Sequence, residues 1–289
     1  MEIQDFAGIH DGETCVLIGN GPSQRNINLD KLGHLPTFAV NQIYHVYDDT
    51  DWRPTYFGMM HKKPGERWKM EAIRQNVDKS IIFTDTNFPL SNPSVNIITL
   101  TGLGRLMDSL ASNVILNQCE DYARMVARDL FSDDLPRGYY SFHSEYIMAQ
   151  LIAYMGFDEV FLIGFDPLLI QNQIVDFSGK LDPSEYNDRM EYLMDTLRVG
   201  APQDVKNGIL WTLSRRFPKL YQMVAKEQSY FHDQYEHEPK SAMEKHEHLM
   251  SHLIISKAFE MRSIEAYHVH SEGIDCYQSV DPHEFEDII

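Results

Sequence analysis

Residues 19–23, Gly-Asn-Gly-Pro-Ser, have the composition of a turn that can hold a phosphate group. They follow the short apolar run 15–18, which is typical of a buried strand because glycine and proline bound its β-forming residues. Glycine lets the backbone approach a ligand closely, and outward-facing amides can donate hydrogen bonds to an anion. Ligands of open α/β sheets bind beyond the carboxyl ends of the strands, so the turn predicts a nucleotide site. The alternative is a strand-to-helix turn whose glycines serve only the backbone geometry.

The turn does not match the two best-known phosphate-binding loops. The dinucleotide fingerprint places a third glycine three residues after the second, where this chain has Gln24. No Gly-Lys-Ser/Thr sequence follows, so the turn is not a P-loop. An NAD-dependent oxidoreductase is therefore disfavoured.

The composition predicts a folded protein with little affinity for polyanions. The 289 residues suit one large domain or one domain with an insertion, and 43% hydrophobic residues suffice for a core. The formal net charge of −18 disfavours nucleic acid and anionic membranes as partners. Cys15, Cys119 and Cys276 are far apart without Cys-x-x-Cys spacing, which favours a reducing compartment. The amino terminus lacks signal-peptide features and no apolar run approaches the ~20 residues of a membrane span, so we expect a cytoplasmic protein.

Strand-like and helix-like segments alternate along most of the chain. Strands are predicted at residues 15–18, 37–40, 55–58, 80–84, 95–100, 159–163 and 264–269, and helical segments at residues 28–33, 64–76, 111–131, 144–155 and 244–261. In the clearest unit, Ser144 is the predicted N-cap of a helix and Gly156 its predicted C-cap, before the strand 159–163. This alternation predicts an α/β fold with a doubly wound, mainly parallel sheet. We predict nothing distinctive for the acidic carboxyl-terminal tail.

Residues 167–240 are the stretch where this alternation stops. The stretch is polar and aromatic, with helical fragments at 183–198 and 210–226 and no convincing strand. Because it follows the carboxyl end of a predicted strand, it could act as a lid over the ligand, or it could be a helical subdomain that only enlarges the core. We predict a single α/β domain over residues 1–289 with a helical, lid-like insertion at about 167–240.

Three stretches together resemble a known family. They are residues 19–23, residues 38–44 (Phe-Ala-Val-Asn-Gln-Ile-Tyr), and residues 144–166, which end in Gly-Phe-Asp. Their order and strand context are similar to those of the small bacterial sialyltransferases of glycosyltransferase family 42. They are also similar to the related proteins of domain of unknown function 115, which include motility-associated flagellin glycosyltransferases and an archaeal pterin diphosphokinase. The resemblance covers most of residues 13–166 and returns at about 229–280, and the insertion is weakly matched.

The resemblance implies a single Rossmann-like domain with a lid and a CMP-sugar donor. Asn20, Gly21 and Ser23 would hold the donor phosphate and ribose, Asn41 and Gln42 would contact phosphate or sugar, and the loop after the last strand would contact the base. Ser144 would bind the nucleotide from a helix N-terminus, whose dipole attracts anions. The full set that the resemblance implies for donor binding is Gly19, Asn20, Gly21, Pro22, Ser23, Asn41, Gln42, Ser144, Asp166, Ser271, Glu272 and Gly273.

The catalytic base of the resembled family is a histidine beyond the lid. Residues 229–235, Ser-Tyr-Phe-His-Asp-Gln-Tyr, resemble the His-Phe-x-x-x-Tyr signature of the related families, with the first two residues exchanged. By this resemblance His232 would deprotonate the acceptor hydroxyl, and an imidazole pKa of about 6.5 suits that role. The alternative is an ordinary histidine, since the chain has 13. The family also places two tyrosines soon after its Gly-x-Asp strand end, whereas residues 167–173 contain none; Tyr186 or Tyr192 could substitute.

Three other groups of side chains could do chemistry but have simpler explanations. Residues 47–51 contain an Asp-x-Asp that could hold a divalent metal, although a solvated acidic turn explains it better. His248 and His252 have the spacing of a metal pair, but the glutamate of a zinc protease is missing and a solvated helix face is favoured. His268 and His270 point to one face of the last strand, where either one lines the pocket or both are packed.

The function that the sequence predicts is transfer of a CMP-activated, sialic-acid-like sugar to a hydroxyl acceptor, by inversion and without a metal or other cofactor. The expected partners are a nucleotide-sugar and a glycan or small hydroxyl acceptor, and a homo-oligomer is compatible with the sequence. Two alternatives stay open. One is a diphosphokinase-like transfer from ATP to a small alcohol, and the other is a non-catalytic nucleotide-binding protein of the same fold.

Overall fold

The structure is a computed structural model that describes residues 1–60, 67–85, 96–105, 119–141, 143–165, 242–270 and 276–289. Its main strands are β1 (Thr14–Ile18), β2 (Thr37–Val40), β3 (Tyr56–Met59), β4 (Ile81–Thr84), β5 (Ile97–Thr99), β8 (Glu159–Ile163), β9 (Glu265–Val269) and β10 (Gln278–Val280). Two further strands, β6 (Gly102–Arg105) and β7 (Tyr139–Ser141), pair with each other. The α-helices are α1 (Arg67–Asn76), α3 (Cys119–Asp129), α4 (Ser144–Met155), α9 (Ala242–Glu260) and α10 (Pro282–Ile288). The 3-10 helices are η1 (Ile3–Phe6), η2 (Pro22–Asn26), η3 (Leu29–His34) and η4 (Ile43–Val46).

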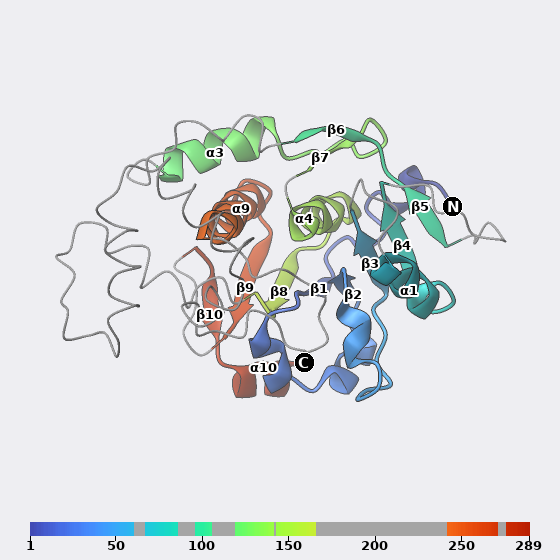
Figure 1. Ribbon diagram of the computed structural model, residues 1–289. Helices are drawn as coiled ribbons and strands as arrows, with labels where there is room; N and C mark the ends of the chain where they lie inside the picture. Colours follow the sequence, from blue (N-terminus) through green and yellow to red (C-terminus); the bar gives the residue numbers. More distant parts are fainter. Residues whose placement is uncertain (61–66, 86–95, 106–118, 142, 166–241, 271–275) are drawn as a thin grey trace, which may run out of the picture.

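The main strands form one sheet in the order β10-β9-β8-β1-β2-β3-β4-β5, with helices on both faces (Figure 1). Each neighbouring pair is parallel. The chain moves outward from β1 to β5 in one direction and from β8 to β10 in the other, so the strand order reverses between β1 and β8. The predicted α/β, doubly wound, Rossmann-like architecture is confirmed.

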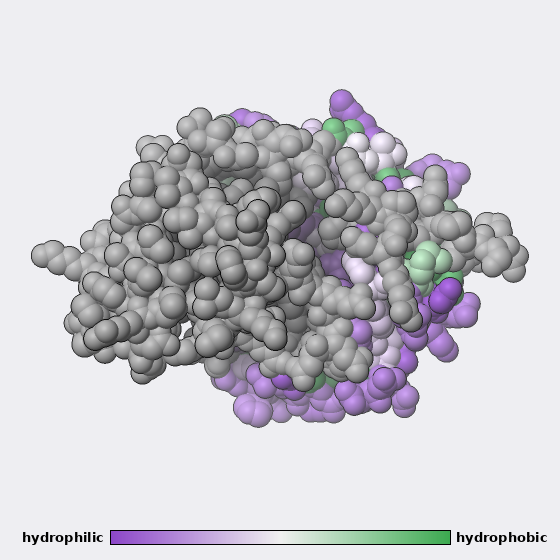
Figure 2. All heavy atoms as spheres, in the orientation of Figure 1, coloured by the Kyte–Doolittle hydropathy of each residue, from purple (hydrophilic) through white to green (hydrophobic). Residues whose placement is uncertain are grey.

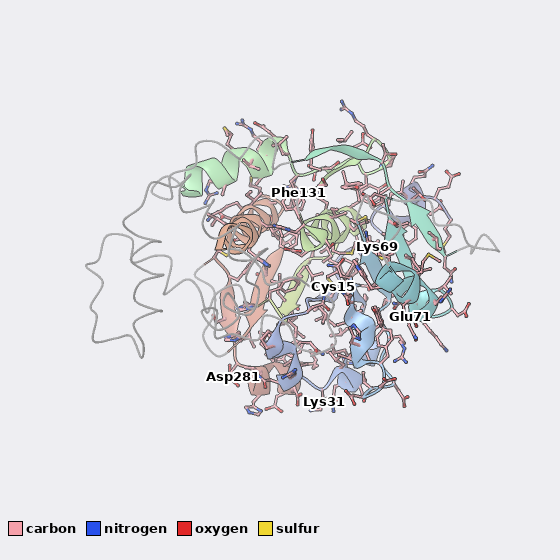
Figure 3. All side chains as sticks on the ribbon, viewed as in Figure 1. Cys15, Lys31, Lys69, Glu71, Phe131 and Asp281 are labelled. Atoms are coloured by element: carbon pink, nitrogen blue, oxygen red, sulfur yellow. The ribbon has the colours of Figure 1, made fainter. Side chains whose placement is uncertain are left out.

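Strand β1 shows why the sheet needs a cover on both faces. Cys15 and Leu17 belong to a core with residues of α3, α4 and α9, whereas Val16 and Ile18 belong to a second core with residues of α1, α10 and the 3-10 helices. These side chains are all fully buried. Cys15 lies near the centre of the molecule (Figure 3), and burial raises the pKa of its free thiol. A continuous apolar run is therefore the natural sequence of a central parallel strand.

Helix α4 is apolar around most of its circumference because it packs against both the sheet and helix α9. Its Met148 lies on Gly58 of β3, where a Cβ would collide with the methionine side chain. Gly156 ends the helix as predicted, with a φ of +87° that glycine adopts without strain. The predicted N-cap is wrong by one residue, since His143 is the N-cap and Ser144 is the first helical residue.

The carboxyl-terminal tail contributes more than the sequence predicted. Strand β10 extends the sheet beyond β9, and helix α10 places the fully buried Phe285 in the second core. Asp281 caps α10 by accepting a hydrogen bond from the amide of His283, and Pro282 occupies the first helical position. Aspartate followed by proline is a helix-start signal, so this element could have been found from the sequence.

Hydrophilic side chains cover the surface over α10 and the neighbouring 3-10 helices (Figure 2). Lys31 of η3 and Glu286 of α10 form an ion pair there, with 2.8 Å between Nζ and Oε2. The hydrogen bond from Lys31 holds the pKa of Glu286 below its usual value. Among the helices that the structure describes, none is long and apolar enough to cross a membrane.

Candidate functional site

The candidate site lies where the carboxyl ends of β1 and β8 meet, at the reversal of the strand order. The two strands are in register, with Ile18 opposite Ile163. Their pairing continues beyond the strands, since the amide of Gly19 donates to the carbonyl of Ile163 at 2.8 Å and the amide of Gly21 donates to the carbonyl of Gly164 at 2.7 Å. At such a reversal the loops on either side diverge, and the crevice between them is where open α/β sheets bind their ligands.

The glycines of the turn do not have the predicted role. We expected outward-facing amides for a phosphate, but the amides of Gly19 and Gly21 bind the end of β8. A Cβ on Gly19 would lie 2.5 Å from the carbonyl oxygen of Gly164, and Gly164 itself has a φ of +71°. Glycine is required because two backbones touch, which is the structural alternative that the sequence left open. The 3-10 helix η2 follows, rather than the long helix of a dinucleotide-binding turn.

Side chains from separate segments meet beside this turn. Asn20, after β1, donates from Nδ2 to the carbonyl oxygen of Val40 at 3.0 Å. Asn41, after β2, accepts a hydrogen bond at Oδ1 from the hydroxyl of Ser144 at 3.1 Å. Gln42 follows Asn41 and is buried. The structure therefore brings together four residues that the sequence assigned to one site.

Asn41 supports this arrangement through its backbone as well as its side chain. Its φ of +56° lies in the left-handed region, which asparagine tolerates better than alanine. Asn41→Gly removes the hydrogen bond to Ser144 without straining the backbone. Asn41→Ala removes the same hydrogen bond and also strains the backbone. We expect urea denaturation to show a loss of about 2 kcal/mol for Asn41→Ala and about 1 kcal/mol for Asn41→Gly. Equal losses would contradict a role for the backbone conformation.

The start of α4 is acidic. Glu145, next to Ser144 in the first turn, is only 5% exposed. The hydroxyl proton of Ser144 is donated to Asn41, so Ser144 presents lone pairs to a ligand. A carboxyl group at a helix N-terminus offsets the attraction of the dipole for a further anion. The start of α4 therefore suits a hydrogen-bond donor, such as a hydroxyl or amino group, better than the anion that the helix dipole led us to expect.

Two histidines of β9 and its end lie next to β8. His268 is fully buried, and its Nε2 lies 3.1 Å from the carbonyl oxygen of Phe165. Its ring stacks on that of His270, with 5.5 Å between centroids and 7° between planes. Burial, and to a smaller extent the neighbouring His270, lowers the pKa of His268 to about 4. The sequence left open whether these histidines are packed or line the pocket, and the structure packs His268 beside the end of β8.

The other predicted site residues lie outside the described part of the chain. They are Asp166, His232, Ser271, Glu272 and Gly273, together with the insertion 167–240 and its Tyr186 and Tyr192. Their roles stay predictions. The last described residues before Asp166 and Ser271 are Phe165 and His270, at the carboxyl ends of β8 and β9.

Of the other groups of side chains, the acidic turn lies away from this edge of the sheet. The acidic turn, residues 47–51, precedes β3 and so lies toward the amino ends of the strands. Its Asp49 and Asp51 are exposed, as expected of a solvated turn. Within the described ranges, no group of three or more His, Cys, Asp or Glu side chains could hold a metal ion. The prediction of a solvated helix face is wrong for His252, which is fully buried with its ring centroid 5.0 Å from that of Phe165.

The sequence matches no protein-family model and no curated protein. Among solved structures, it is similar to a variant of the sialyltransferase CST-II in complex with CMP, at 12% identity over 93% of this chain and 87% of that chain, with a TM-score of 0.40. The monofunctional alpha-2,3-sialyltransferase Cst-I from Campylobacter jejuni is similar at 15% identity over 94% of this chain and 81% of that chain, with a TM-score of 0.39. At these identities and TM-scores the likenesses establish neither a family nor an activity for this chain.

Proposed function

We propose that this protein is a glycosyltransferase that takes a CMP-activated, sialic-acid-like sugar as donor and transfers the sugar to a hydroxyl acceptor. The observation that carries the proposal is the meeting of Asn20, Asn41, Gln42 and Ser144 at the reversal of the strand order. These residues are dispersed along the chain, and they are the positions at which the sequence resembles the donor-binding residues of family 42 sialyltransferases. A crevice at this point of a parallel sheet is also where a nucleotide is expected.

The reaction would be an inverting displacement without a metal ion. The acceptor hydroxyl attacks the anomeric carbon, its proton passes to His232, and the bond from that carbon to the phosphate oxygen breaks, so that CMP leaves with the electron pair. The crevice residues would bind and orient the donor. Asn20 and Asn41 are fixed by their hydrogen bonds before the donor arrives, which reduces the entropy lost on binding.

Thermal melting in the presence of CMP, CDP, ATP and NAD tests the proposal. We expect CMP to stabilise the protein by ~2.7 kcal/mol at about 100 times its dissociation constant, and a CMP-sugar to be hydrolysed slowly without acceptor. His232→Ala is expected to keep the stabilisation by CMP and to lose the hydrolysis, because the proposed base acts on the attacking hydroxyl and not on CMP.

Other outcomes identify the alternatives. Stabilisation by ATP with a magnesium-dependent transfer would support the diphosphokinase-like activity. Binding of CMP with no turnover, unchanged in His232→Ala, would support a non-catalytic nucleotide-binding protein. The absence of any stabilisation by CMP would contradict the proposed donor.

A further inference from the structure

The side-chain amide of Asn41 has one end bound by the protein and the other end available to a ligand. Its Oδ1 accepts a hydrogen bond from the hydroxyl of Ser144, the first residue of α4, at 3.1 Å. The nitrogen of a planar amide points away from the partner of the oxygen, so Nδ2 of Asn41 points away from Ser144. Nδ2 makes no hydrogen bond with any described residue and is not a buried atom, and Asn41 is partly exposed where β2 ends. This donor can therefore be reached from solvent.

The orientation of this amide follows from the burial of Ser144, which is only 7% exposed. If the amide were turned over, Nδ2 would donate to the hydroxyl oxygen of Ser144. The hydroxyl proton would then have no acceptor in the described part of the chain. A buried donor without an acceptor is costly, whereas Nδ2 at the exposed side can be hydrated. The stable orientation is therefore the one in which Oδ1 of Asn41 faces Ser144.

A fixed Nδ2 supplies a hydrogen-bond donor that the neighbouring backbone does not. The amides of Gly19 and Gly21 donate to the end of β8. The buried carboxyl group of Glu145 opposes an anion at the start of α4, and the hydroxyl proton of Ser144 is already given to Asn41. An anionic ligand at this edge of the sheet therefore needs donors from side chains. An amide nitrogen donates and cannot accept, so it favours a negatively charged oxygen.

We propose that Ser144 is a positioning residue, whose hydroxyl holds the amide of Asn41 so that Nδ2 donates to a negatively charged oxygen of the sugar donor. The proposal rests on the proposed function, and it differs from the direct contact with the nucleotide that the resemblance implies for Ser144. A CMP-activated, sialic-acid-like sugar has two groups with such oxygens, the phosphate and the sugar carboxylate. Both present the same chemistry to Nδ2, and the experiment below separates them.

Two binding preferences, each a ratio of dissociation constants from titration calorimetry, report on the two charged groups. The preference for CMP over cytidine reports on the phosphate. The preference for CMP-sialic acid over CMP reports on the carboxylate, and it is measured in proteins that also carry His232→Ala so that the donor is not hydrolysed. A loss in the first preference places Nδ2 of Asn41 at the phosphate, a loss in the second places it at the carboxylate, and either one supports the proposal.

Variants at the two positions give the expected losses. Asn41→Asp still accepts from Ser144 but presents a carboxylate oxygen in place of Nδ2, so one preference should fall about 30-fold. Ser144→Ala frees the amide and should lower the same preference about 5-fold, whereas Ser144→Thr keeps the hydroxyl and should restore it. The matched control is Ser80→Ala, which should keep both wild-type preferences. The buried hydroxyl of Ser80 also lies within hydrogen-bond distance of an asparagine, 3.4 Å from Oδ1 of Asn76, but at the amino ends of the strands.

A double-mutant cycle shows whether Ser144 acts through Asn41. Asn41→Gly lacks the amide, so adding Ser144→Ala to it should lower the preference no further. A further loss of about 5-fold in the double variant would mean that Ser144 contacts the donor itself, and it would overturn the positioning role. If Asn41→Asp changes neither preference, Nδ2 meets no anion, and the inference fails while the proposed donor stands. If the wild type binds no CMP, both proposals fail. Thermal melts show that each variant is folded before it is titrated.

Discussion

Gly164→Ala is expected to lower the free energy of unfolding by about 3 kcal/mol, because two costs add at this position. The φ of +71° costs alanine about 1–2 kcal/mol. The new Cβ would also lie 2.7 Å from the carbonyl oxygen of Gly19 and 3.1 Å from the Cβ of Gln24, and forcing these loops apart costs about 1–3 kcal/mol. Urea denaturation at neutral pH measures the loss. The loop after β1 also holds Asn20 against Val40, so under the proposed function the affinity for CMP should fall as well.

Substitutions at two other glycines separate the cost of backbone strain from the cost of the close contact. Gly19→Ala isolates the backbone contact, since its φ is not positive while its Cβ would lie 2.5 Å from the carbonyl oxygen of Gly164; we expect a loss of about 2 kcal/mol. Gly33 is the matched control, because its Cβ would meet nothing within 4 Å. Gly33→Ala should change stability by about 0.5 kcal/mol or less. If Gly164→Ala proved as stable as Gly33→Ala, the contact between the two loops would be absent.

The central strands and the main helix were predictable because one local rule determines each. The residues of β1 and β8 are buried on both faces, which requires a continuous apolar run in the sequence. Helix α4 combines a run of apolar residues with a glycine at its carboxyl end, and that glycine adopts the left-handed conformation that is typical of a helix C-cap. Strand β10 is different, since it has only three residues, mostly exposed, and pairs with β9 alone. Its conformation depends on the edge of a sheet built by distant residues, and no local pattern indicates that.

The grouping of the candidate site residues was predictable, but their contacts were only partly so. Parallel strands bring their carboxyl ends to one edge, so Asn20 and Asn41 had to be neighbours once β1 and β2 were adjacent. The amides of Gly19 and Gly21 are not available to a phosphate because they donate to the end of β8. This pairing depends on the register between β1 and β8, which the sequence does not specify. The burial of Glu145 and the orphaned nitrogen of His268 likewise follow from packing between segments that are distant in the chain.

Acidification is expected to destabilise the protein by about 3 kcal/mol through His268. The pKa of histidine is about 6.5 in an unfolded chain, whereas burial in the folded protein, aided by His270, lowers the pKa of His268 to about 4. Between these values the unfolded chain binds more protons than the folded one, so the free energy of unfolding rises with pH. The contribution of the neutral imidazole is complete above about pH 6.5 and is lost as the pH falls toward about 4. Urea denaturation at successive pH values measures the slope.

The variant His268→Leu should flatten this slope, and His34→Leu, a control at an exposed histidine, should leave it as in the wild type. If the free energy of unfolding of His268→Leu kept the wild-type slope against pH, another titratable group would cause the pH dependence. Nε2 already carries the proton that it donates to the carbonyl oxygen of Phe165, so the proton that His268 gains at low pH goes to Nδ1, where no acceptor in the described part of the chain receives it.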